Sequence, residues 1–178
     1  MISMKRHVVL IAGVTVALAC GMAAAAVKTS DGSGNPAVVK RDGARAYDKN
    51  GNPTFDIKPD GTVDWLTFSG YIRYTANCMQ CHGPDGMGSS YGPALVNSLQ
   101  HLSYTDFANV VTNGRVNVTS SQDNVMPKWG LNPNVMCYLD DIYVYLRARS
   151  DNAVPRGRPR KHAAKGAAYA KMEDSCMS

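Results

Sequence analysis

The chain has 178 residues, with 19 Lys or Arg, 14 Asp or Glu and a formal net charge of +5. This length is typical of a single domain. The basic excess is too small to indicate a nucleic-acid-binding protein, and it falls to +3 if the predicted leader is removed with Lys5 and Arg6.

Residues 1–26 have the pattern of a secretory signal peptide. Lys5 and Arg6 precede an apolar run at residues 8–20, and small residues follow at 23–26, with an A-x-A-like cleavage site near Ala25 or Ala26. The apolar run has 13 residues, whereas a membrane-spanning helix needs about 20, so a retained anchor is the weaker alternative. The sequence therefore predicts export to the periplasm without stable insertion in the membrane.

Residues 27–64 are rich in turn-forming dipeptides, among them Asp42-Gly43, Asn50-Gly51 and Asp60-Gly61. Asn-Gly and Asp-Gly supply the positive φ angles that tight hairpin turns need. We expect an N-terminal extension of turns and short hairpins without a helix. Residues 48–52 resemble half of a calcium-binding loop, but the later glutamate is missing, so a plain turn is the preferred interpretation.

The most informative stretch is Cys78-Met79-Gln80-Cys81-His82, because C-x-x-C-H is the attachment motif of c-type haem. It predicts that Cys78 and Cys81 form thioethers to one covalent haem c and that His82 is the proximal iron ligand. A structural zinc site would need a second pair of ligands, and a thioredoxin-like redox motif would need a βαβ context. Neither is visible in the sequence.

Helical patterns surround this motif. One begins near residues 64–69 and runs into Cys78, a second covers 103–113 with Ser103 as its N-cap, and a third runs from Pro133 or Asn134 to Arg149. The polar stretch 115–125 separates the last two. Residues 151–178, with several prolines, glycines and basic residues, predict a loosely ordered, exposed C-terminal tail.

A haem iron with one histidine needs a sixth ligand or keeps an open site. Met126 lies 44 residues after His82, far enough for the chain to pass around a haem, and Pro127 stiffens its approach. A thioether is a soft, neutral ligand that favours ferrous iron. Met126 is therefore the predicted distal ligand, with His101 and His162 as alternatives.

Further residues are assigned to supporting roles. The carbonyl of Pro93 is the predicted acceptor for the second ring nitrogen of His82. After removal of the leader, Cys137 and Cys176 remain outside the haem motif, and such a pair in an oxidising compartment predicts a disulfide. Four further residues are candidates for contact with the haem edge or its propionates: Tyr91, Asn113, Arg115 and Trp129.

Together these residues resemble the class I cytochromes c. Gly70 and Tyr74 lie eight and four positions before Cys78, Gly92-Pro93 follows His82, and Met126-Pro127 precedes a helix with Tyr145. The resemblance covers residues 69–150. It implies a mainly α fold of three to five helices around one haem, and a cytochrome domain at 65–150 between the extension at 27–64 and the tail at 151–178.

The wider chain is similar to the cytochrome c-L type electron acceptors of methanol dehydrogenases, particularly those of lanthanide-dependent enzymes. Residues 61–65, 81–88, 138–149 and 156–159 carry this similarity. It implies a monomeric periplasmic one-electron carrier, not an enzyme, between a pyrroloquinoline quinone (PQQ) dependent alcohol dehydrogenase and a small cytochrome c or an oxidase. The alternatives are a haem sensor or gas-binding protein with an open sixth position, a small haem enzyme, and a carrier for an unrelated dehydrogenase.

Overall fold

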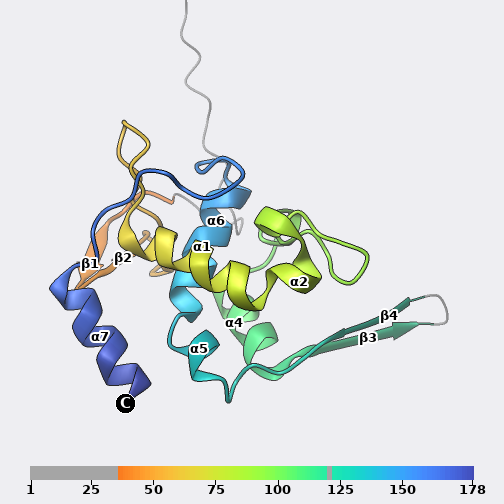
Figure 1. Ribbon diagram of the computed structural model, residues 1–178. Coiled ribbons are helices and arrows are strands. Elements are labelled where there is room, and N and C mark those ends of the chain that lie inside the picture. The colour runs from red at the N-terminus through yellow and green to blue at the C-terminus, as the bar shows by residue number, and fades with distance from the viewer. Residues whose placement is uncertain (1–35, 120–121) are drawn as a thin grey trace, which may run out of the picture.

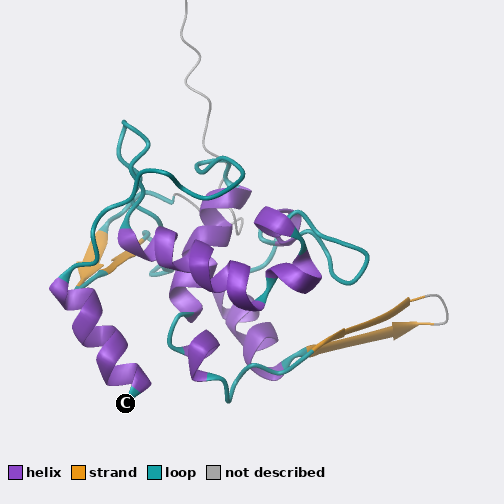
Figure 2. Cartoon of the chain, viewed as in Figure 1, coloured by secondary structure: helices purple, strands orange, loops and turns teal. Residues whose placement is uncertain are grey.

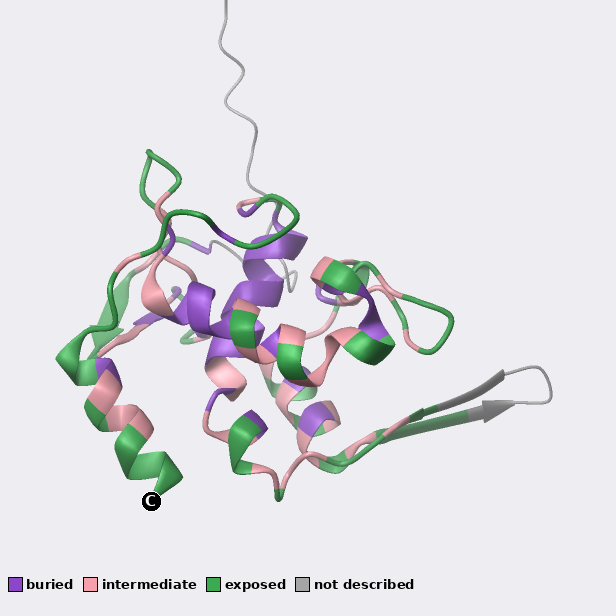
Figure 3. Ribbon diagram, in the orientation of Figure 1, coloured by how far each residue is buried: buried purple, intermediate pink, exposed green. Residues whose placement is uncertain are grey.

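Two helices cross at the centre of the computed structural model, which describes residues 36–119 and 122–178. They are α1 (Trp65–Asn77) and α6 (Leu139–Ser150) (Figure 1). Helix α1 is capped by Asp64, whose carboxylate accepts a hydrogen bond from the backbone N–H of Thr67 at 2.9 Å. Every residue of α6 from Asp141 to Ser150 is buried, as Figure 3 shows, so this helix forms the centre of the core.

The crossing depends on a glycine. A Cβ on Gly70 would lie 1.9 Å from the carbonyl oxygen of Asp141 and 2.8 Å from the Cβ of Tyr145, so α1 approaches α6 as closely as backbone allows. The ring of Tyr145 packs against those of Tyr71 and Tyr74, with 5.6 Å between centroids in both pairs. This arrangement agrees with the first-helix glycine and final-helix aromatic predicted from the sequence.

Shorter elements surround the two central helices. They are β1 (Lys40–Asp42), β2 (Arg45–Tyr47), α2 (Met79–His82), η1 (Pro84–Gly86), α3 (Leu95–Ser98), α4 (Tyr104–Asn113), β3 (Arg115–Thr119), β4 (Gln122–Met126), α5 (Pro133–Met136) and α7 (Ala167–Met177). The mainly helical fold class predicted from the sequence is confirmed, although the described residues form seven α-helices rather than the expected three to five. The predicted leader at 1–26 lies outside the described residues, and both it and the domain boundaries remain predictions.

The N-terminal extension contains the expected small hairpin, in which β1 pairs antiparallel with β2. The turn that follows is anchored by Asp48, whose Oδ1 accepts hydrogen bonds from the backbone N–H groups of Asn50 and Asn52. Its Oδ2 lies 2.7 Å from Nη2 of Arg147 on α6, and both side chains are fully buried. Residues 48–52 therefore form a turn whose carboxylate is bound by Arg147, and the preference for a plain turn over a calcium loop stays a prediction.

The last predicted helix is in fact two, which corrects the expectation of one continuous helix ending at Arg149. Helix α5 ends at Met136 and α6 begins at Leu139. Between them, the backbone N–H of Tyr138 donates to the carbonyl of Val135 at 3.1 Å, which tightens the chain into a turn. This turn places Cys137 beside α7.

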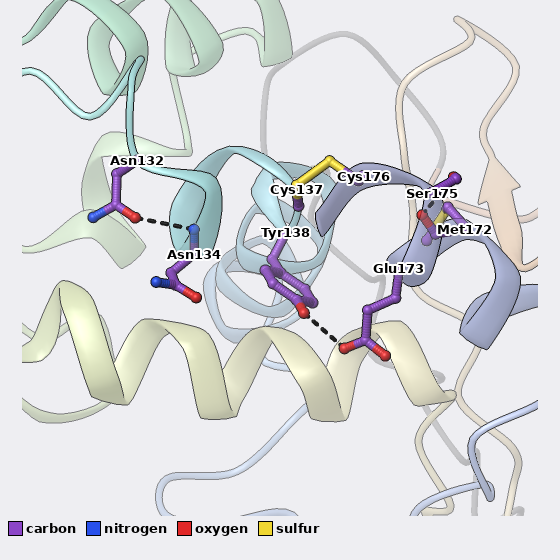
Figure 4. Close-up of a disulfide and its surroundings, with 8 residues drawn as sticks. All are labelled: Asn132, Asn134, Cys137, Tyr138, Met172, Glu173, Ser175 and Cys176. Carbon is purple, nitrogen blue, oxygen red and sulfur yellow. Dashed lines mark hydrogen bonds between the residues drawn. A yellow bond between two sulfur atoms is a disulfide. The ribbon is translucent and has the colours of Figure 1, made fainter. Parts of the chain in front are cut away.

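The C-terminal tail is also better ordered than predicted, which corrects the expectation of a loosely ordered segment. Helix α7 is joined to the turn after α5 by a disulfide between Cys137 and Cys176, with a Cα–Cα distance of 5.7 Å (Figure 4). Tyr169 on α7 is buried. Composition alone predicted an exposed tail, whereas a covalent link and an aromatic anchor hold its last helix against the body.

The stretch after α4 forms a hairpin that was not predicted from the sequence. Strand β3 pairs antiparallel with β4, with Arg115 opposite Met126, and the pair extends as an arm from the helical body (Figure 2). The alternation of Val116 and Val118 with polar residues is a strand signal. It was missed because residues 115–125 contain neither Asn-Gly nor Asp-Gly, the strongest hairpin signals.

Candidate haem site

The two motif cysteines lie where α1 ends and α2 begins. Cys78 is the C-cap of α1, is partly buried and packs against the main core cluster, whereas Cys81 is exposed. The backbone N–H of His82 donates to the carbonyl of Cys78 at 2.9 Å, so one helical turn presents both sulfur atoms and the imidazole together.

The imidazole of His82 is 8% exposed and is oriented by the loop that follows it. Its Nδ1 lies 3.1 Å from the carbonyl oxygen of Pro93, as the sequence predicts. A carbonyl only accepts, so Nδ1 carries the proton and Nε2 keeps a free lone pair for a metal. Gly92 allows this approach, because a Cβ there would lie 3.0 Å from Nδ1.

Two further hydrogen bonds hold the motif, and neither was predicted from a sequence pattern. The hydroxyl of Tyr74 donates to the carbonyl of Gly83 at 2.5 Å, which fixes the residue after His82 to the last turn of α1. The hydroxyl of Ser89 donates to the carbonyl of Cys81 at 2.5 Å. Both satisfy carbonyls at the end of the short helix α2.

Met126 lies at the end of β4, partly buried against the same core cluster as Cys78. The chain on either side is held against α4. Gly114, which follows α4, lies so close that a Cβ would be 2.6 Å from the carbonyl oxygen of Met126, and the N–H of Trp129 donates to the carbonyl of Val111 at 3.0 Å. The loop with the predicted distal ligand is therefore fixed by backbone contacts.

The other predicted haem contacts differ in position. Trp129 is partly buried against the main core cluster, whereas Asn113 and Arg115 are exposed and Tyr91 is 75% exposed. Their contacts with haem remain predictions. His101, one alternative ligand, is exposed after α3.

His162, the other alternative ligand, lies in a different part of the molecule. Its ring stacks on Phe68 with 3.6 Å between centroids. Phe68 lies ten residues before Cys78 on α1, which corresponds to about 15 Å along the helix. His162 is therefore not placed to share an iron with His82.

The donor set fits haem c and does not fit a metal ion bound by protein side chains alone. Within residues 36–119 and 122–178, no group of three or more His, Cys, Asp or Glu side chains is arranged to hold a metal ion. A pair of thiols beside a single oriented imidazole, next to partly buried apolar side chains, is what a covalent porphyrin requires. The partly buried apolar side chains that pack against the same core cluster as Cys78 include Leu95, Leu102, Met126 and Trp129.

The fold, the C-x-x-C-H motif and the oriented histidine define a class I cytochrome c, and the chain belongs to the c-type cytochromes, the electron-transfer proteins that carry covalent haem c. Residues 68–146 match the family model described as cytochrome c oxidase, cbb3-type, subunit III.

Particular relatives agree with this assignment. The chain is 49% identical over 134 residues to cytochrome c-553I of Paracoccus denitrificans, covering 75% of this chain and 59% of that protein. It is 40% identical over 100 residues to cytochrome c-555 of Methylococcus capsulatus, covering 56% of this chain and 75% of that protein. The crystal structure of the c-type cytochrome XoxG from Methylobacterium extorquens AM1 has 47% sequence identity and a TM-score of 0.71, covering 78% of this chain and 85% of that one.

Proposed function

We propose that this cytochrome is a one-electron carrier in which Cys78 and Cys81 bind haem covalently and His82 and Met126 are its axial ligands. The observation that carries the proposal is the hydrogen bond from His82 Nδ1 to Pro93, which leaves Nε2 as a fixed donor. Bound haem supplies a ferric–ferrous couple.

The chain's own contribution is to keep the ligand geometry constant. Pro93 and Gly92 fix the ring of His82, and the backbone of Trp129 anchors the segment that follows Met126. The segments that contain Cys78 and Met126 both pack against one apolar cluster, and this cluster excludes water from the core beside the haem motif. A site that is already organised needs little rearrangement when an electron enters or leaves, and such a site suits transfer rather than bond chemistry.

We propose a PQQ-dependent methanol or alcohol dehydrogenase as the electron donor, and a small cytochrome c or an oxidase as the acceptor. The resemblance of residues 61–65, 81–88 and 138–149 to cytochrome c-L type acceptors supports this assignment. The leader-like residues 1–26 support a periplasmic location. No helix in the described part of the chain is long and apolar enough to cross a membrane.

Exposed basic side chains give the carrier a means of finding an acidic partner. Lys128 follows the Met126 loop, and the segment after α6 contributes Arg156, Arg158, Arg160, Lys161 and Lys165, all exposed. Encounters between redox proteins are small and transient, so attraction between surface charges raises their association rate. We expect the rate of reduction by the donor to fall as salt is raised.

The test is reduction of the purified ferric cytochrome by PQQ-dependent methanol dehydrogenases with methanol present. The proposal predicts rapid, alcohol-dependent reduction that slows with salt, and no binding of carbon monoxide to the ferrous protein at neutral pH. Failure of every such dehydrogenase to reduce a correctly ligated cytochrome would contradict the proposed donor. Rapid carbon monoxide binding would indicate an open sixth position and a sensor instead.

A further inference from the structure

The turn that follows His82 contains an aspartate in an unusual backbone conformation. Asp85, in η1, has a φ of 61°, and Asn152 is the only other non-glycine residue with positive φ in the described part of the chain. L-residues enter this region at an energetic cost, although Asp and Asn tolerate it best. Surrounding contacts must therefore hold Asp85 in place.

Those contacts come from a segment about seventy residues further along the chain. Oδ1 of Asp85 accepts from the backbone N–H of Gly157 at 2.9 Å, and Oδ2 lies 3.2 Å from Nε of Arg156. The Asp85 side chain is only 10% exposed, whereas that of Arg156 is 65% exposed. Arg156 and Gly157, both in the segment after α6, thus donate to the Asp85 carboxylate on the turn beside the haem motif.

A second arginine fixes this segment to the core. Arg149, near the end of α6, is 7% exposed, and its Nη1 donates to the carbonyl of Val154 at 2.5 Å. Its Nε donates to the backbone carbonyl of Asp85 at 3.4 Å. Arg149 and Arg156 therefore hold the main chain and the side chain of the same residue.

Close backbone contacts connect the Asp85 turn to His82 and to Pro93, the acceptor of the His82 hydrogen bond. The N–H of Gly88 donates to the carbonyl of His82 at 2.8 Å, which closes the turn. A Cβ on Gly83 would lie 2.1 Å from the carbonyl oxygen of Gly88, and a Cβ on Gly88 would lie 2.8 Å from the N of Ala94. Ala94 follows Pro93, the acceptor of the His82 hydrogen bond, so no free space separates the turn from this acceptor.

We infer that Asp85, held by Arg156 and Gly157, is a positioning residue for the His82–Pro93 hydrogen bond, through which the C-terminal segment sets the reduction potential. A hydrogen bond from Nδ1 makes the imidazole a stronger donor to iron and so favours the ferric state. Release of the turn would weaken this bond and raise the potential. The inference rests on the proposed ligation of haem by His82.

The experiment compares holoprotein variants that change the charge in opposite senses. Asp85→Asn keeps a residue that tolerates positive φ but removes a negative charge, and Arg156→Gln removes a positive charge from its partner. Arg160→Gln, on the same segment, is the matched control, because Arg160 is exposed and makes no contact with Asp85. Two quantities are measured: the reduction potential, and the hydrogen-exchange rate of the His82 Nδ1 proton by NMR of the ferrous protein.

A positioning role predicts that Asp85→Asn and Arg156→Gln both raise the potential and both make the Nδ1 proton exchange several-fold faster than in Arg160→Gln. Arg156→Lys, which keeps a cationic donor, should restore much of the original behaviour. A pure charge effect predicts a higher potential for Asp85→Asn and a lower one for Arg156→Gln, with unchanged exchange. That result, or variants identical to the Arg160→Gln control, would overturn the inference. Absence of histidine-ligated haem from the wild-type protein would instead contradict the proposed function.

Discussion

The hydroxyl of Tyr169 donates a hydrogen bond of 2.5 Å to the carboxylate of Asp141, joining α7 to the buried centre of α6. The hydroxyl of Ser69 on α1 lies 2.8 Å from the same Tyr169 hydroxyl. The three side chains therefore form a hydrogen-bond network that links α1, α6 and α7. Asp141 is only 1% exposed. Burial is the main cause that raises the pKa of Asp141 to about 7, with a smaller contribution in the same direction from neighbouring Asp140.

This raised pKa predicts a pH dependence of stability. Between about pH 4 and pH 7 the unfolded chain ionises Asp141 while the folded chain keeps it protonated, so the free energy of unfolding falls as pH rises. The difference between the pKa of Asp141 in the folded chain and in the unfolded chain corresponds to a loss of about 4 kcal/mol in the free energy of unfolding. This loss is complete above pH 7. The measurement is denaturant unfolding of the wild-type holoprotein from pH 4 to pH 8.

Asp141→Asn is the matched control for this pH dependence. An amide keeps an acceptor for Tyr169 but does not titrate, so the difference in unfolding free energy between the two proteins should change only across this interval. Other acids titrate similarly in both proteins and cancel. A difference that stayed constant from pH 4 to pH 8 would show that Asp141 has an ordinary pKa.

The disulfide between Cys137 and Cys176 predicts a second stability effect. It closes a loop with a sequence separation of 39 residues, for which the chain-entropy model gives about 4 kcal/mol. We expect the double variant Cys137→Ser/Cys176→Ser to lose stability of this order in chemical unfolding. The reduction potential should stay unchanged, because α7 packs on the side of α1 and α6 away from the haem motif (Figure 1).

Met177→Ser, a neighbouring substitution on α7 that keeps the disulfide, is the control for this effect. Met177 is 43% exposed, so its loss should change stability little. Equal stability of the double cysteine variant and this control would show that non-covalent contacts alone hold the tail. One such contact is the 2.7 Å hydrogen bond from the hydroxyl of Tyr138 to Glu173.

The buried ion pair of Asp48 and Arg147 predicts strong coupling between the N-terminal extension and α6. Asp48→Asn keeps an acceptor for the turn but leaves the guanidinium uncompensated, which we expect to cost about 3–5 kcal/mol in thermal or chemical unfolding. Arg147→Met in the same chain removes the buried charge. The double variant should therefore be more stable than Asp48→Asn alone, and additive losses would contradict the coupling.

The haem motif and its immediate partners could be predicted from the sequence because they depend on local spacing. Cys78, Cys81 and His82 lie within one turn of chain, and Pro93 follows closely enough for its loop to close on the ring. The start of α4 at the Ser103 cap could be predicted for the same reason, since Ser103 accepts from the N–H of Asp106 at 3.1 Å. Such features are fixed by neighbours in sequence.

What the sequence did not predict depends on contacts between distant segments. The disulfide between Cys137 and Cys176 was predicted from the cysteine count and is confirmed, but the order of the tail also depends on Tyr169, which bonds to Asp141 on a different helix. The contact between Asp85 and Arg156 also joins segments 71 residues apart, and no sequence pattern indicates that these two segments meet. Residues 115–126 were hard to predict for a different reason. Their alternation of apolar and polar residues is weak, and a polar stretch of this kind is equally typical of a loop.

The identity of the distal ligand is the central claim, and the visible spectrum of the ferric holoprotein tests it most directly. Methionine-ligated ferric haem shows a weak charge-transfer band at long wavelength. We predict this band in the wild-type protein and in Met87→Ala, whose methionine is 45% exposed, and its complete loss in Met126→Ala. Persistence of the band in Met126→Ala, or its absence from the wild-type protein, would contradict the assignment of Met126 as the sixth ligand.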